Sequence, residues 1–123
     1  MAWEIEFTDE FGAWWETLTA EQQEALDARE ALLSEGGPGL GRPLVDSIES
    51  SRHSNMKELR ASSDGALRVL FAFDPRRAAI LLLGGNKSGR WEQWYRDNVP
   101  LADDLYDEHL AQLAREGHGN AKD

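Results

Sequence analysis

The chain has 123 residues, enough for one domain with a sizeable core. Its hydrophobic fraction of 41% and its five tryptophans exclude a disordered composition, and the absence of cysteine excludes a disulfide scaffold or a thiolate metal site. No apolar stretch approaches the ~20 residues of a membrane span, and the first residues lack the basic and apolar regions of a signal peptide. We therefore expect a cytoplasmic protein.

The net charge of −10 is unevenly distributed along the chain. Residues 1–35 hold ten acids and one base, residues 36–100 hold seven acids and ten bases, and residues 101–123 hold six acids and two bases. A uniformly acidic protein would repel a polynucleotide. Because the bases gather in the middle of this chain, a local phosphate-binding site remains compatible with its composition.

The first 38 residues predict a strand followed by two helices. Apolar and acidic residues alternate from Trp3 to Phe7, which is typical of a strand with one buried face. Thr8 or Asp9 can then cap a short helix, and Thr19 with Gln22 has the form of a capping box that opens a second one. The apolar positions of the first helix follow helical spacing: Phe11, Trp14, Trp15, Leu18. The second helix should end in the glycine–proline segment Gly36-Gly37-Pro38.

Residues 37–54 predict a long surface connection with a short strand or turn near Leu44–Ile48. Three antiparallel strands should follow over residues 55–60, 67–73 and 78–87, because Asp64-Gly65 and Asp74-Pro75 are turn signals.

Alternation along these strands sorts their side chains into two faces. Leu67, Val69, Phe71 and Phe73 share one face of the middle strand, so Arg68 points the other way, and Arg60 of the preceding strand points the same way as Arg68. The third strand is continuously apolar, as expected of a strand covered on both faces, and delivers Lys87 to a loop.

Residues 88–96 predict a short helix or turn, which Asn98-Val-Pro100 should break. An amphipathic helix then runs from Leu101 to about Glu116, with an inner face that includes leucines 101, 105, 110 and 113 and with His109 as a surface histidine. We expect a single domain over residues 1–116 and a frayed tail over residues 117–123.

Few chemical sites fit these residues. The segment around Lys87 departs from the phosphate-binding loop pattern, and the three histidines lie far apart, so we expect neither a metal nor a cofactor. Arg60, Arg68, Lys87 and Tyr95 suit cleavage of RNA without a metal, since cations stabilise the charge on the phosphoryl oxygens while the 2′-hydroxyl attacks. Basic residues on an exposed sheet face are also commonly just solvated, and that alternative stays open.

The chain contains three segments in this order: Lys57-Glu-Leu-Arg60, Leu67-Arg-Val-Leu-Phe-Ala-Phe73 and Leu81-Leu-Leu-Gly-Gly-Asn-Lys87. Together they resemble the RelE/ParE toxin superfamily, in its phage Gp49-like, HigB-type branch. The similarity spans roughly residues 3–113. It implies an α+β, RelE-like fold with an N-terminal strand, two helices, a three-stranded antiparallel meander and a C-terminal helix.

The resemblance also implies a function. Such a chain is expected to be the toxin of a type II toxin–antitoxin system that cleaves mRNA on the ribosome and is held inactive by a cognate antitoxin, often a helix-turn-helix protein. The resemblance assigns Arg60, Arg68 and Lys87 to phosphate binding and Tyr95 to an aromatic or proton-transferring role. Further RNA-binding candidates are the remaining central bases and one histidine: Arg52, His53, Lys57, Arg76, Arg77, Arg90, Arg96.

Two alternatives remain. The chain is either a non-catalytic toxin that inhibits a protein target such as DNA gyrase, as the ParE branch does, or an inactive toxin-fold protein that only binds antitoxin. The net charge of −10, where many relatives are basic, gives weight to the second alternative.

Overall fold

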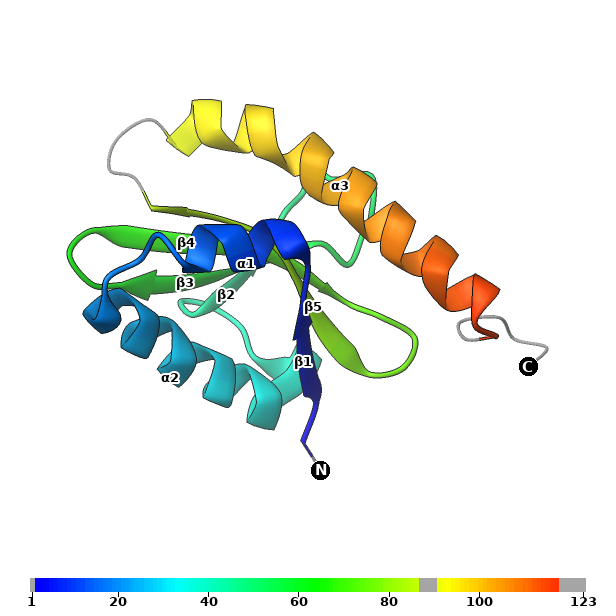
Figure 1. Cartoon of the computed structure of the whole chain (residues 1–123), viewed down its shortest axis with the longest axis horizontal. Helices are drawn as coiled ribbons and strands as arrows, with labels where there is room; N and C mark the ends of the chain where they lie inside the picture. The colour runs from blue at the N-terminus through cyan, green and yellow to red at the C-terminus, as the bar shows by residue number, and fades with distance from the viewer. Residues whose placement is uncertain (1, 87–90, 118–123) are drawn as a thin grey trace.

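A computed structural model describes residues 2–86 and 91–117, which form one five-stranded sheet with helices on both faces (Figure 1). The strand order is β1-β5-β4-β3-β2. In chain order the elements are β1 (Glu4–Phe7), α1 (Asp9–Trp15), α2 (Ala20–Gly36), a short 3₁₀ helix (Gly37–Gly39), β2 (Val45–Ser47), β3 (Lys57–Ser62), β4 (Ala66–Phe73), β5 (Ala78–Asn86) and α3 (Trp91–Arg115).

The sheet is mixed. Strands β3, β4 and β5 form the predicted antiparallel meander, while β1 pairs with β5 in parallel and β2 adds a short antiparallel edge to β3. The predicted α+β class is confirmed, with β2 as a strand that the sequence indicated only as a strand or turn.

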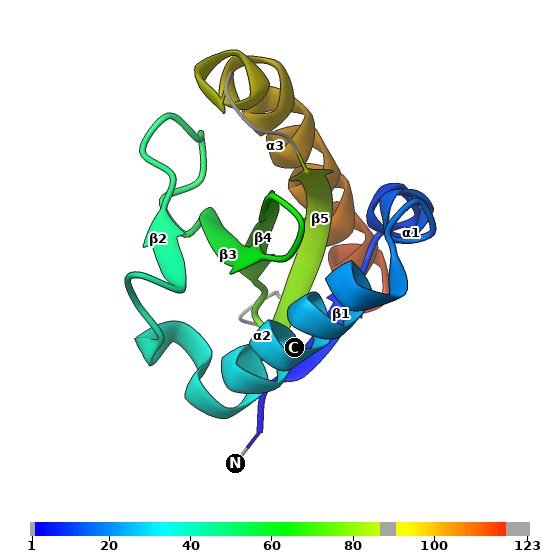
Figure 2. The same ribbon diagram turned by 90° about the vertical axis from the view of Figure 1, so that its left-hand side faces the viewer.

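Helices lie on both faces of the sheet (Figure 2), and an apolar layer of side chains lies on each face. Helices α1 and α2 pack on the face that carries Leu67, Val69 and Phe71, as alternation predicts. Helix α3 packs on the opposite face, against Leu70 and Ala72. Strand β5 contributes residues to both layers and is buried on both sides, as its apolar run indicates.

The helix starts follow the predicted caps. Thr8 accepts a hydrogen bond from the Phe11 N–H at the start of α1. Thr19 and Gln22 form both hydrogen bonds of a capping box at the start of α2. Such caps satisfy backbone donors that have no partner within the helix, each contributing about 1 kcal/mol. They fix where α1 begins after β1 and where α2 begins after α1.

Two glycines let tryptophans from opposite layers touch the end of β5. A Cβ at Gly84 would lie 2.2 Å from the Trp14 ring, and a Cβ at Gly85 would lie 2.4 Å from the Trp94 indole nitrogen. Any side chain at either position would therefore collide with a tryptophan. The Gly84-Gly85 pair therefore allows Trp14 of α1 and Trp94 of α3 to pack closely on the end of β5, beside the residues predicted to form the site.

The predicted break at Asn98–Pro100 is wrong, because α3 continues through Pro100 as one helix. A proline inside a helix removes one hydrogen bond and costs about 3 kcal/mol. Here Pro100 is exposed, while Val99, Ala102 and Tyr106 pack on the sheet without interruption. The burial of apolar side chains on both sides of Pro100 therefore outweighs the cost of the proline. As a result, Trp94 and Tyr95 belong to the same helix as Tyr106.

Two predicted core positions are exposed instead. Leu101 was expected on the inner face of α3 but is 52% exposed. Because α3 is one helix from Trp91 onward, its phase places Val99 and Ala102 on the inner face instead. Phe7, on edge strand β1, is 65% exposed. Within residues 2–86 and 91–117, no helix is long and apolar enough to cross a bilayer.

Candidate functional site

Arg60 and Arg68 lie directly opposite each other on the paired strands β3 and β4. Both point to the sheet face that α3 covers, as alternation predicts. That face is not open to solvent there, since Trp91 and Tyr95 of α3 lie against the two arginines. The alternative that these arginines are merely solvated on an exposed sheet face therefore does not describe them, since the side chains of Arg60 and Arg68 are only 32% and 21% exposed.

A buried carboxylate, Glu58, occupies the centre of this group. Arg60 donates from Nε and Nη2 to Glu58 Oε2 at 2.9 and 2.7 Å, and the Tyr95 hydroxyl donates to Glu58 Oε1. Arg68 Nη1 lies 3.8 Å from Oε2. We call Glu58, Arg60, Arg68 and Tyr95 the Glu58 cluster. The sequence places Glu58 on the same face as Arg60, but nothing in the spacing singles out its role.

The cluster uses only part of its donor capacity. Arg60 Nη2 also donates to Asp46 at 3.2 Å, but Arg60 Nη1 has no hydrogen-bond partner within the described part of the chain. Arg68 donates no hydrogen bond to any described residue, and its Nε is fully enclosed. Its guanidinium instead lies over the Trp91 ring, 5.1 Å from the centroid. A half-buried cation with unused donors is an unfavourable arrangement that an anion would relieve.

The neighbours of the cluster shift two of its pKa values. Hydrogen bonds to Glu58 raise the pKa of Arg60, so it remains charged. Burial, and next the hydrogen bond to Glu58, raises the pKa of Tyr95 to about 12. The Tyr95 phenol therefore stays protonated across the physiological range and acts as a hydrogen-bond donor.

Two clefts open on either side of Arg60. One, of about 470 Å³, is lined by Glu58, Arg60 and Tyr95 together with the segment from Asp46 to Ser50. The other, of about 330 Å³, is lined by Arg60 and Arg68 together with Arg29, Ser62 and Ala66. A ligand in either cleft can reach Arg60, and the first cleft also leads to the Glu58 carboxylate.

The other predicted RNA-binding residues do not join this group. Lys57 precedes Glu58 on β3 and lines a separate depression with Gly39 and Ser47. Arg76 bonds Asp74 and Glu6, and Arg77 lies over the Trp3 ring, so both belong to the β4–β5 turn. Arg96 is exposed on α3 and donates to Gln93. Lys87 and Arg90 lie outside the described residues, so their assignments stay predictions.

Arg52 and His53 bond acidic residues of α3, although the Arg52 side chain remains 52% exposed. The buried Asp103 carboxylate accepts hydrogen bonds from the Ser51 hydroxyl and the Arg52 N–H. Asp107 contacts both the Arg52 guanidinium and His53 Nε2. These bonds fasten the segment between β2 and β3 onto α3, which fixes one wall of the 470 Å³ cleft.

We expect Asp103→Ala to release this segment. The change leaves the Ser51 hydroxyl and the Arg52 N–H without their acceptor, at a cost of about 2–3 kcal/mol. Urea unfolding measures the loss, and hydrogen exchange locates it between residues 48 and 55. Glu108, an exposed acid of the same helix with no hydrogen bond or ion pair to a described residue, is the matched control, since Glu108→Ala should change stability by no more than about 0.5 kcal/mol. Equal effects of the two substitutions would rule out the anchoring role of Asp103.

The same fold occurs in solved structures of RelE proteins. A mutant of the E. coli toxin RelE in the free state matches with a TM-score of 0.61 at 13% identity, covering 82% of this chain and 98% of that one. A chain of the archaeal RelE–RelB complex from Pyrococcus horikoshii OT3 matches with a TM-score of 0.55 at 13% identity, covering 73% of this chain and 100% of that one. The fold is therefore RelE-like.

The sequence is more specific. Residues 13–107 match the family described as phage derived protein Gp49-like, and the chain belongs to that family. "Putative toxin HigB2" of Mycobacterium tuberculosis is 51% identical over 107 residues, 85% of this chain and 53% of that protein. "Putative toxin HigB3" of the same organism is 46% identical over 98 residues, 80% of this chain and 85% of that protein. This chain thus spans about half the length of the first relative, and the resemblance to the HigB-type branch is confirmed.

Proposed function

We propose that this protein is the toxin of a type II toxin–antitoxin system and acts in the cytoplasm as a ribosome-dependent endoribonuclease that needs no metal. Support comes from its HigB-named relatives and from the Glu58 cluster. The observation that carries the proposal is Arg68, a half-buried guanidinium directly opposite Arg60 with no hydrogen bond to any described residue. An RNA phosphate is the natural acceptor for two such neighbouring arginines.

In the proposed complex the scissile phosphate lies against Arg60 and Arg68. Glu58 and Asp46 hold the Nε and Nη2 atoms of Arg60, which leaves Nη1 to donate to a phosphoryl oxygen. The substrate therefore does not have to break the Arg60–Glu58 pair in order to bind. As negative charge grows on the phosphoryl oxygens, both guanidinium groups stabilise it.

Glu58 is the candidate general base. Its carboxylate lines the 470 Å³ cleft and can accept the proton of a 2′-hydroxyl placed there. The 2′-oxygen then bonds to phosphorus and the 5′-oxygen leaves. The leaving 5′-oxygen takes a proton from solvent water, so the products are a 2′,3′-cyclic phosphate and a 5′-hydroxyl, and this step needs no metal. Among the described residues, no group of three or more acidic or histidine side chains is arranged to hold a metal ion.

Tyr95 orients the base in this scheme. An in-line displacement places the base and the leaving-group acid on opposite sides of phosphorus, whereas Tyr95 donates directly to Glu58. Two groups in direct hydrogen-bond contact do not serve opposite ends of the same reaction. We therefore assign Tyr95 to holding the Glu58 carboxylate, and its pKa of about 12 keeps it a donor throughout.

The reading as an inactive protein that only binds antitoxin has an observation in its favour. Arg60 is already paired with Glu58 and Asp46, and the chain carries a net charge of −10, so its attraction for RNA over long distances is weak. The unused donors of Arg68 weigh against it. The gyrase-directed alternative predicts DNA damage in place of RNA cleavage.

Induction of the protein in a bacterial host separates these functions. We expect growth arrest with new 5′ ends in the translated regions of mRNA, and no arrest when the adjacent gene, expected to encode a helix-turn-helix antitoxin, is expressed together with it. An SOS response with intact transcripts would instead support the gyrase-directed alternative. Normal growth with intact transcripts would leave only the antitoxin-binding reading.

A further inference from the structure

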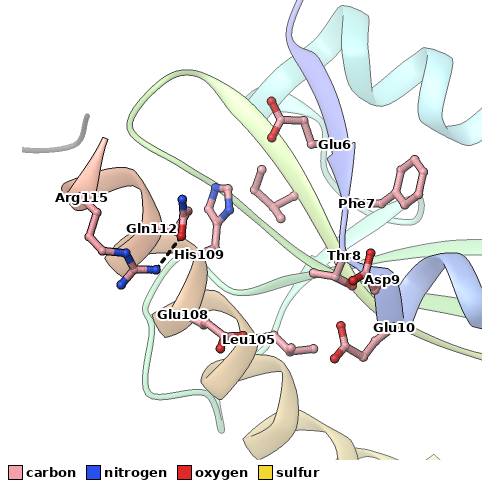
Figure 3. A pocket seen from close by; sticks show the side chains of 11 residues that line it. Glu6, Phe7, Thr8, Asp9, Glu10, Leu105, Glu108, His109, Gln112 and Arg115 are labelled. Atoms are coloured by element: carbon pink, nitrogen blue, oxygen red, sulfur yellow. Dashed lines mark hydrogen bonds between the residues drawn. The ribbon is translucent and has the colours of Figure 1, made fainter. Parts of the chain in front are cut away.

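Phe7 is a large apolar side chain left in solvent at the edge of the sheet. It belongs to β1, the outermost strand, and is 65% exposed. Figure 3 shows its ring on the side of β1 away from His109 and α3. Its ring centroid lies 5.9 Å from that of Phe11, so Phe7 extends the buried aromatic group of α1 to the surface.

An apolar groove lies beside Phe7, between α1 and α2. Its floor and one wall are formed by Phe7, Phe11, Gly12 and Trp15, and its volume is about 330 Å³. A Cβ added at Gly12 would lie 3.4 Å from the Phe7 ring, so the ring lies close to the α1 backbone at that point. The groove lies on the α1–α2 face of the sheet, whereas the Glu58 cluster lies on the α3 face.

Carboxylates surround this apolar surface. Glu16, Asp27 and Glu30 line the groove itself. A second depression on the other side of Phe7 is lined by four further acids together with His109 and Arg115, all shown in Figure 3: Glu6, Asp9, Glu10, Glu108. Within the groove, burial and next the charge of Asp27 raise the pKa of Glu30 to about 7. An apolar floor with acidic walls fits a partner segment that has apolar side chains on one side and lysine or arginine around them.

We propose that this groove and Phe7 form the docking surface for a basic, amphipathic segment of the antitoxin. The identity of the partner rests on the proposed function, while the surface and the chemistry of the segment follow from the groove. Large apolar side chains of the segment pack on Phe7 and Trp15, and its cations face Glu16, Asp27 and Glu30. Because the groove and the Glu58 cluster are on opposite faces of the sheet, the antitoxin can hold the toxin without filling the proposed catalytic cleft.

Phe7→Ser and Glu16→Lys test the surface. The probe is the purified protein encoded by the adjacent gene, titrated calorimetrically against this chain. Each substitution should weaken binding at least about tenfold, since a central aromatic anchor or a facing charge is lost. The matched control is Leu101→Ser, which removes an exposed leucine from α3 and should leave the affinity within twofold. Unchanged binding by Phe7→Ser, or no binding by the unaltered chain, would overturn the proposal.

Two further readouts separate this proposal from the proposed function. Phe7→Ser should still arrest growth but should no longer be neutralised by the antitoxin; if the unaltered chain arrests nothing, the calorimetric comparison still decides the docking surface.

Affinity for the antitoxin should also fall as the pH drops below about 7, because cations of the partner favour ionised Glu30 and binding releases its proton. Asp27 and Glu16 are the other titratable groups lining the groove, so Glu30→Gln must reduce this dependence. An unchanged dependence would contradict the role of Glu30.

Discussion

Replacing Arg68 by methionine is expected to abolish RNA cleavage while leaving the protein at least as stable as before. The guanidinium has no hydrogen bond to any described residue, so the fold gains little from its charge. A side chain of similar length keeps the packing under Trp91 and removes the cost of a poorly paired, half-buried cation. Losing one preorganised donor to the phosphoryl oxygens typically costs about 10²–10³ in rate.

Thermal denaturation and an mRNA cleavage assay together measure this effect. The control is Arg115→Met, which alters an exposed arginine at the far end of α3. It should leave both quantities unchanged. If Arg68→Met lowers stability strongly and keeps cleavage, Arg68 has a structural role and the proposed phosphate site is wrong.

Removal of the Glu58 carboxylate is expected to damage both stability and activity. Glu58→Ala leaves Arg60, Arg68 and the Tyr95 hydroxyl around an empty position, and loss of one partner from a buried ion pair costs about 3–5 kcal/mol. Without the proposed base, cleavage should fall by about 10²–10⁴-fold. Urea unfolding and the cleavage assay measure the two losses.

A double-substituted variant separates these two effects. Glu58→Gln combined with Arg60→Gln removes both charges of the pair, so its stability loss should be smaller than the sum of the single losses. Cleavage should nevertheless remain absent. A Glu58→Ala variant as stable as the unaltered protein would show that the cluster does not hold β3, β4 and α3 together.

Local patterns were sufficient to predict the helix starts and the faces of the strands. The capping residues Thr8 and Thr19 bond within three residues of themselves, and strand alternation placed Arg60 and Arg68 on one face. Because these features depend only on residues that are close in the chain, they can be predicted from a single sequence. The continuous helix through Pro100 was missed because its cause, burial of Val99 and Ala102 on the sheet, is a tertiary effect.

The partners of charged side chains were harder to predict. Tyr95 meets Glu58 across 37 residues, and His109, predicted to be a surface histidine, bonds the buried Asp74 at 2.8 Å across 35 residues. Arg52 and His53 reach α3 across more than 50 residues. Such pairs form only when the fold brings distant segments together. For this reason composition and spacing indicated a group of cations but not the carboxylate at its centre.

The most direct test of the proposed chemistry is the structure of the RNA ends that the purified protein produces on ribosomes programmed with a defined mRNA. Attack by the 2′-hydroxyl predicts 2′,3′-cyclic phosphate ends from the unaltered protein and intact mRNA with Arg68→Met. Cleavage that leaves 3′-hydroxyl ends, or equal cleavage by both proteins, would contradict the assignment of the Glu58 cluster as a ribonuclease site.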